Sequence, residues 1–232
     1  MIFATMEVEM ATISQPLPIR TRLRPKALVF AFIGMMMAYV LFHNESFLVN
    51  SADPVWNHYQ PFKWWLLPHG LAGCCALLLG PLQFSDRLRQ RYLKLHRVIG
   101  YVYVSGAMVL APLGAYIQYF EERMGGTRSF TMAATADAGL LMLTTAIALW
   151  FVLRGKVQQH RQWMTRSYAV ALVFLEVRVI SGLGGWDNSA TAGETIVWMC
   201  LIFAYPLADI VLTWQDFRRS NPVKVKDRAA AA

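Results

Sequence analysis

Two histidine–arginine pairs, His96–Arg97 and His160–Arg161, carry the side chains of this sequence best suited to chemistry. Each pair lies where a basic loop runs into a long apolar segment. An imidazole can ligate a metal or move a proton near neutral pH, and a guanidinium can hold an anionic group through paired hydrogen bonds. The four residues are therefore predicted to form a cofactor site, with His96 and His160 as the metal ligands; the alternative is that they hold the phosphates of lipid headgroups.

A second group of ionisable residues lies inside the apolar segments themselves. Its members are His69, Asp137, Glu176 and Arg178. Charges inside lipid are costly, so they mark either a substrate or proton path or a buried ion pair that fixes helix register. Arg178 and Asp137 are the expected ion pair, because they lie at similar depth. Glu176 is two positions from Arg178 and faces another direction on a helix.

The elements that must position these residues are long apolar segments. The chain has 232 residues, 56% hydrophobic and 16% charged, and a mean hydropathy of +0.36. Several segments approach the roughly 20 residues that cross a bilayer as a helix. Six such segments are predicted: Ala27–Phe42, Phe62–Phe84, Val98–Tyr119, Phe130–Leu153, Met164–Leu183 and Gly193–Trp214. The first is expected to continue toward His43. The expected fold is an all-α polytopic bundle, with a four-helix core from segments two to five.

The distribution of positive charge predicts the topology. Of the 22 Lys and Arg residues, 18 lie in the N-terminal arm, the second and fourth loops, and the tail. This asymmetry predicts that both termini and both His–Arg pairs are cytoplasmic. Residues 1–26 are then a cytoplasmic arm, 27–214 the transmembrane domain and 215–232 a basic cytoplasmic tail. Topology and anionic lipid account for the net charge of +8, so no nucleic-acid partner is expected.

The second loop interleaves leucine and tyrosine with arginine and lysine between Ser85 and His96. This pattern predicts an amphipathic helix at the membrane surface that leads into the third segment. Ser85 is its expected N-cap.

Known catalytic motifs do not assign an activity to the sequence. It contains no phosphate-binding Gly-rich loop, no HExxH and no GxSxG. Two histidines on facing helices can clamp a haem iron while neighbouring arginines pair its propionates. The leading hypothesis is therefore electron transfer through one b-type haem, with quinone or another redox partner. The alternatives are a transporter or proton-coupled permease that uses the intramembrane cluster, and a non-catalytic membrane subunit.

Three motifs resemble those of an uncharacterised family of bacterial multi-pass membrane proteins. They are His69-Gly70-x-x-Gly73, Leu95-His96-Arg97-x-x-Gly100 and His160-Arg161-x-Trp163-Met164-x-Arg166. The resemblance implies a bacterial inner-membrane location but no activity. The sequence is more loosely similar to six-helix transmembrane b-type cytochromes. That similarity implies His96 and His160 as one axial pair, whereas Asp137 stands where a second pair needs a histidine.

Overall fold

In the computed structural model, the described residues are 25–45, 47, 50 and 52–220, and within these every regular element is a helix. The helices are α1 (Pro25–His43), α2 (Val55–Tyr59), the 3-10 turn η2 (Gln60–Phe62), α3 (Lys63–Gln83), α4 (Asp86–Arg91), α5 (Leu93–Arg123), α6 (Arg128–Leu153), α7 (Val157–Ala171), α8 (Val173–Gly184) and α9 (Ala190–Ser220). The predicted N-terminal arm, except the last two residues of 1–26, and positions 221–232 of the predicted tail lie outside the described residues.

Five stretches of the described chain are helical, long and apolar enough to cross a membrane. They are Val55–Gln83, Leu93–Arg123, Arg128–Leu153, Val157–Gly184 and Ala190–Phe217. A shorter apolar helix, Ala27–His43, precedes them. The predicted helix bundle is thus present, and the first segment does continue to His43.

Several helices extend beyond the predicted apolar segments. The third segment was expected at Val98–Tyr119, but its helix α5 covers Leu93–Arg123. Helical hydrogen bonds form equally well where the chain leaves the hydrocarbon, so hydropathy underestimates helix length. The fifth segment begins at Val157 and contains an interruption at Leu172, which separates α7 from α8.

The basic second loop folds into α4, as its interleaved leucine and arginine residues predict. Ser85 caps this helix, because its hydroxyl accepts a hydrogen bond of 3.3 Å from the Leu88 amide. The helix ends at Arg91, and the chain turns at Tyr92 before α5 begins. His96 therefore lies in the first turn of a helix that is long and apolar enough to cross a membrane, and not in the loop.

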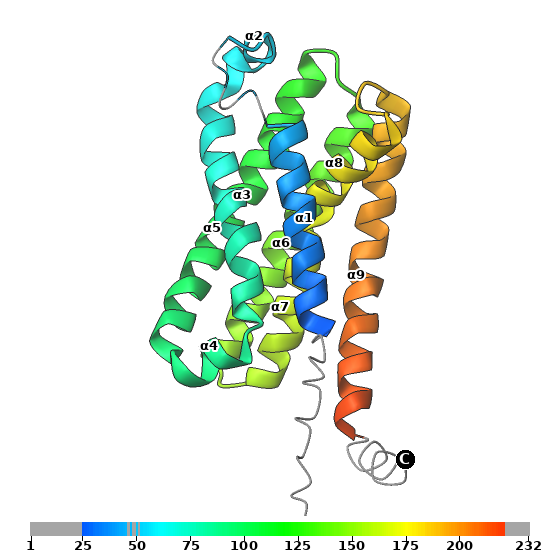
Figure 1. Ribbon diagram of the computed structural model, residues 1–232. Coiled ribbons are helices and arrows are strands. Elements are labelled where there is room, and N and C mark those ends of the chain that lie inside the picture. Colours follow the sequence, from blue (N-terminus) through cyan, green and yellow to red (C-terminus); the bar gives the residue numbers. More distant parts are fainter. Residues whose placement is uncertain (1–24, 46, 48–49, 51, 221–232) are drawn as a thin grey trace, which may run out of the picture.

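Four helices make up the centre of the molecule: α3 packs on α5, α5 on α6, α6 on α7, and α7 returns to α3 (Figure 1). In this ring α5 and α7 are diagonally opposite. Helix α9 packs against α6, α7 and α8, and α1 packs against α8. The start of α1, the end of α9 and α4 lie at one end of the bundle, and α2 lies at the other (Figure 1).

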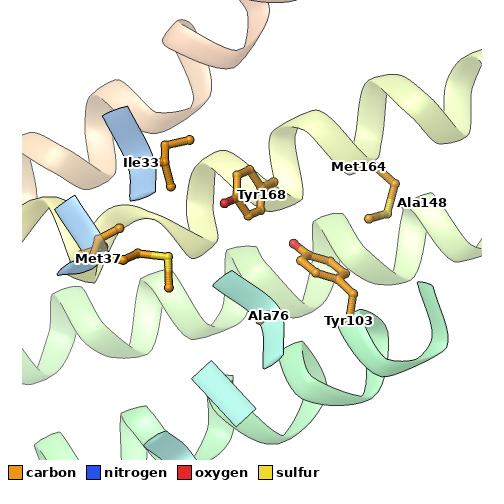
Figure 2. Packing of buried hydrophobic residues seen from close by; sticks show 8 residues of the cluster. Ile33, Met37, Ala76, Tyr103, Ala148, Met164 and Tyr168 are labelled. Carbon is orange, nitrogen blue, oxygen red and sulfur yellow. The ribbon is translucent and has the colours of Figure 1, made fainter. Parts of the chain in front are cut away.

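The core combines small residues with two tyrosine rings. Ala76, Ala148 and the whole of Tyr103 are fully buried, and Tyr168 is nearly so. Figure 2 shows the two rings directed into the space between the helices, with Ile33 of α1 beside Tyr168. Small side chains let helix backbones approach closely, which is how helices associate in lipid.

Candidate functional site: two imidazoles at one end of the bundle

The structure brings His96 and His160 together. His96 lies in the first turn of α5 and His160 in the first turn of α7, the diagonal pair of the bundle. Both are half-buried, and their imidazoles are close enough to interact electrostatically. The side chain of Gln83, at the end of α3, donates a hydrogen bond of 3.2 Å to the backbone carbonyl of His96. Together with Ala148 of α6, whose carbonyl oxygen lies 2.8 Å from His160 Nδ1, all four helices of the central ring meet at this pair.

The hydrogen bonding of His160 fixes its tautomer. Its Nδ1 lies 2.8 Å from the carbonyl oxygen of Ala148 on α6. A carbonyl can only accept, so Nδ1 carries the hydrogen and Nε2 keeps its lone pair when the ring is neutral. Such a bond from the second ring nitrogen to a backbone carbonyl is what orients a metal-ligating histidine.

His96 differs from His160 in its hydrogen bonding. Its Nδ1 is buried and has no hydrogen-bond partner among the described residues. An unpaired buried nitrogen costs about 1–3 kcal/mol, so such a group calls for a ligand, ion or water.

The arginines near the pair differ in exposure and in partners. Arg97 is exposed, and Arg161 is half-buried with interactions of its own. Arg166 was not among the predicted site residues, yet it is held tightly: its Nη2 lies 2.7 Å from the Asp209 carboxylate on α9. The Arg166 guanidinium also lies 5.1 Å from the ring centroid of Trp163.

Two helical turns further into the bundle, α5 and α7 touch directly. The Tyr103 hydroxyl lies 2.9 Å from the Ser167 hydroxyl, which lies 2.7 Å from the Thr145 hydroxyl of α6. All three side chains are fully buried. Tyr103 is seven positions after His96, and Ser167 is seven after His160, so each pair shares a helix face. This hydroxyl network was not predicted, although Ser and Thr in apolar segments are a signal for it.

The predicted intramembrane cluster divides into two groups on different faces of α8. Asp137 is only 6% exposed, and its charged neighbour is Glu176. No salt bridge joins Arg178 to Asp137, both of which are described residues, so the expected ion pair is absent. The reason is helix phase: Arg178 is exposed on another face of α8.

Arg178 belongs to the second group, with His69. The two side chains interact electrostatically, and Arg178 also interacts with Tyr59 and Glu45. His69 Nδ1 lies 3.1 Å from the Leu110 carbonyl, so this ring too carries its hydrogen on Nδ1. Glu45 and Tyr59 were missed, because they lie in the connection between α1 and α3, whose fold hydropathy does not predict.

Burial raises the pKa of the Glu45 carboxyl, and the Arg178 charge lowers it in part.

No group of three or more His, Cys, Asp or Glu side chains that could hold a metal ion occurs among the residues that the structure describes.

The all-helical bundle with its apolar helices defines an integral membrane protein. The model of the DUF2306 family, described as "Predicted membrane protein (DUF2306)", matches residues 66–212. The chain belongs to this family, which confirms the resemblance to an uncharacterised family of membrane proteins. No curated protein and no solved structure matches the chain.

Proposed function

We propose that this protein transfers electrons in the membrane and holds a single b-type haem between His96 and His160. The observation that carries the proposal is the pairing of these two imidazoles on diagonally opposite helices. His160 supports it further, because its hydrogen-bonded Nδ1 leaves Nε2 as a ligand atom. The haem iron, when bound, supplies reversible one-electron chemistry.

The residues around the pair fit such a group. Buried nitrogens normally have a hydrogen-bond partner, so the unpaired Nδ1 of His96 supports a site for a bound group. Arg97 and Arg161 each follow one of the two ligands directly in the sequence. The guanidinium is the side chain best shaped for carboxylates, so these two arginines would hold the propionates.

The proposed topology has six membrane crossings with both termini cytoplasmic. The basic helix α4, the start of α1 and the end of α9 share one end of the bundle (Figure 1). That end carries most of the positive charge, which favours the cytoplasmic side of a bacterial inner membrane. The His96–His160 pair would then exchange electrons near the cytoplasmic surface, with quinone or a protein as redox partner.

An absorption spectrum tests the haem. Protein expressed with ample haem and purified in detergent is expected to show a Soret band, with the split visible bands of a six-coordinate haem after reduction. His96→Ala and His160→Ala should each abolish the six-coordinate spectrum. His58→Ala is the matched control, because His58 lies at the opposite end, 2.9 Å from the Glu121 carboxylate. A colourless wild-type protein, or spectra unchanged in both ligand variants, refutes the proposal.

A further inference from the structure

The second candidate site is independent of the histidine pair and lies at the junction of α6, α8 and α9. Asp137 on α6 faces this junction about 13 Å along the helix from its first residue. Its neighbours there are apolar: Ala133 of α6 packs with Val173 and Val177 of α8 and with Val197 of α9. These alanine and valine side chains remove the Asp137 carboxyl group from water and offer it no hydrogen bonds in return.

Asp137 lacks the partners that normally accompany a buried acid. Only 6% of its surface is exposed, and its Oδ1 has no hydrogen-bond partner among the described residues. Helix α5, which packs on the other side of α6, contributes Ala107 and Ala111 beside Ala138. Arg178, the cation expected to compensate the group, lies on another face of α8.

The titratable group that acts on Asp137 is a second acid, which has a thiol near it. Glu176 of α8 interacts electrostatically with Asp137, and Cys200 of α9 interacts with Glu176. Two carboxylates facing each other in a low-dielectric surrounding repel strongly, and neither repays its desolvation. The arrangement is stable when Asp137, the more buried of the two acids, is protonated and neutral, because this removes both the repulsion and the cost of a buried charge.

A metal ion is a poorer fit than a proton. Hard cations require six or more oxygen ligands, and the walls here are Ala and Val side chains. From this arrangement we infer that Asp137 is a proton-binding site, in which the buried carboxyl group holds one exchangeable proton in the neighbourhood of Glu176. Glu176, which is the more exposed of the two, is the group through which the proton exchanges.

Infrared spectroscopy of the full-length protein in lipid vesicles tests the site. The wild-type protein at neutral pH is expected to show the C=O stretching band of a protonated carboxylic acid, shifted to lower frequency in D₂O. Asp137→Asn and Glu176→Gln should each shift or remove this band, and the double variant should abolish it. Both substitutions are nearly isosteric with the protonated acids, and circular dichroism checks that each variant is folded.

Controls distinguish the proton on Asp137 from that of an unrelated carboxylic acid and from a bound sodium ion. Asp209→Asn removes a carboxylate that is paired with Arg166 and should leave the band unchanged. A wild-type spectrum without the band, or a band that persists in the folded double variant, overturns the inference. So does a band that disappears when sodium chloride replaces choline chloride, because sodium would then occupy the place of the proton. None of these outcomes depends on whether His96 and His160 bind haem.

Discussion

The Tyr168 hydroxyl donates a hydrogen bond of 3.1 Å to the backbone carbonyl of Leu77. That carbonyl has no amide partner four residues on, because position 81 is proline. The Tyr168 hydroxyl of α7 thus supplies the hydrogen bond that α3 cannot make within its own backbone. Removing the hydroxyl with Tyr168→Phe should destabilise the protein by about 1 kcal/mol, which thermal unfolding in detergent measures.

A double-mutant cycle isolates this contact. Pro81→Ala restores an amide hydrogen four residues after Leu77, so the Tyr168→Phe loss should shrink in that background. Equal losses with and without the proline would show that the hydroxyl contributes through something other than the orphaned carbonyl.

Gly80 is predicted to be the most substitution-sensitive glycine of α3. A β-carbon at Gly80 would overlap the ring of Tyr168, whereas one at Gly70 on the same helix meets nothing within 4 Å. We expect Gly80→Ala to cost about 1–3 kcal/mol through overpacking. Gly70→Ala makes the same chemical change and should be neutral or stabilising. Comparable unfolding temperatures for the two variants would contradict the close contact between α3 and the Tyr168 ring.

The hydroxyl network between α5 and α7 is predicted to contribute modestly to stability. Tyr103→Phe removes one hydrogen bond to the Ser167 hydroxyl, which keeps its contact with Thr145. Hydrogen bonds between membrane helices average about 0.6 kcal/mol, so we expect a loss of that order. Tyr101→Phe is the control, because Tyr101 is 69% exposed. A loss several times larger would mean that the network positions the helices and does more than bridge them.

Glu45 is predicted to make the stability of the folded protein depend on pH. Burial raises the pKa of this carboxyl above its ordinary value of 4.5, and Arg178 partly offsets the rise. The folded protein therefore holds the proton more tightly than the unfolded chain, so this contribution to stability is fully present below pH 4.5. It is lost as the pH rises through the folded-state pKa. Unfolding temperatures measured between about pH 4 and 8 should show this decline.

Two variants separate Glu45 from other acids. Glu45→Gln should flatten the decline, and Arg178→Gln should extend it to higher pH by removing the compensating charge. A pH profile unchanged in Glu45→Gln would assign the dependence to another group.

Run length predicted the long helices, though not their ends or the interruption at Leu172, and the charge distribution predicted that His96 and His160 lie at the same end of the bundle. The residue type predicted the Ser85 cap, because serine before a polar helical turn is a local signal. Helix phase could not be predicted in the same way. The expected Arg178–Asp137 pair required two helices to present particular faces to each other, and the packing of small residues such as Ala133 and Ala138 decides those faces.

The tautomer of His160 could not be predicted from the sequence either. It depends on the carbonyl of Ala148, a residue whose side chain carries no chemistry and whose importance is its place on the neighbouring helix. The Asp137–Glu176 pair also depends on tertiary packing, although both residues stand out in the sequence as costly in lipid.

The family match begins at residue 66, after α1, and α1 packs chiefly along α8. Its Ile33 lies beside Tyr168 (Figure 2), its Met37 belongs to the same buried cluster as Leu175, and its Phe30 ring stacks on Phe84. The first helix therefore covers part of the surface of the helices that the family model matches. Loosening α1 would open the tyrosine-lined interior sideways to the surrounding acyl chains.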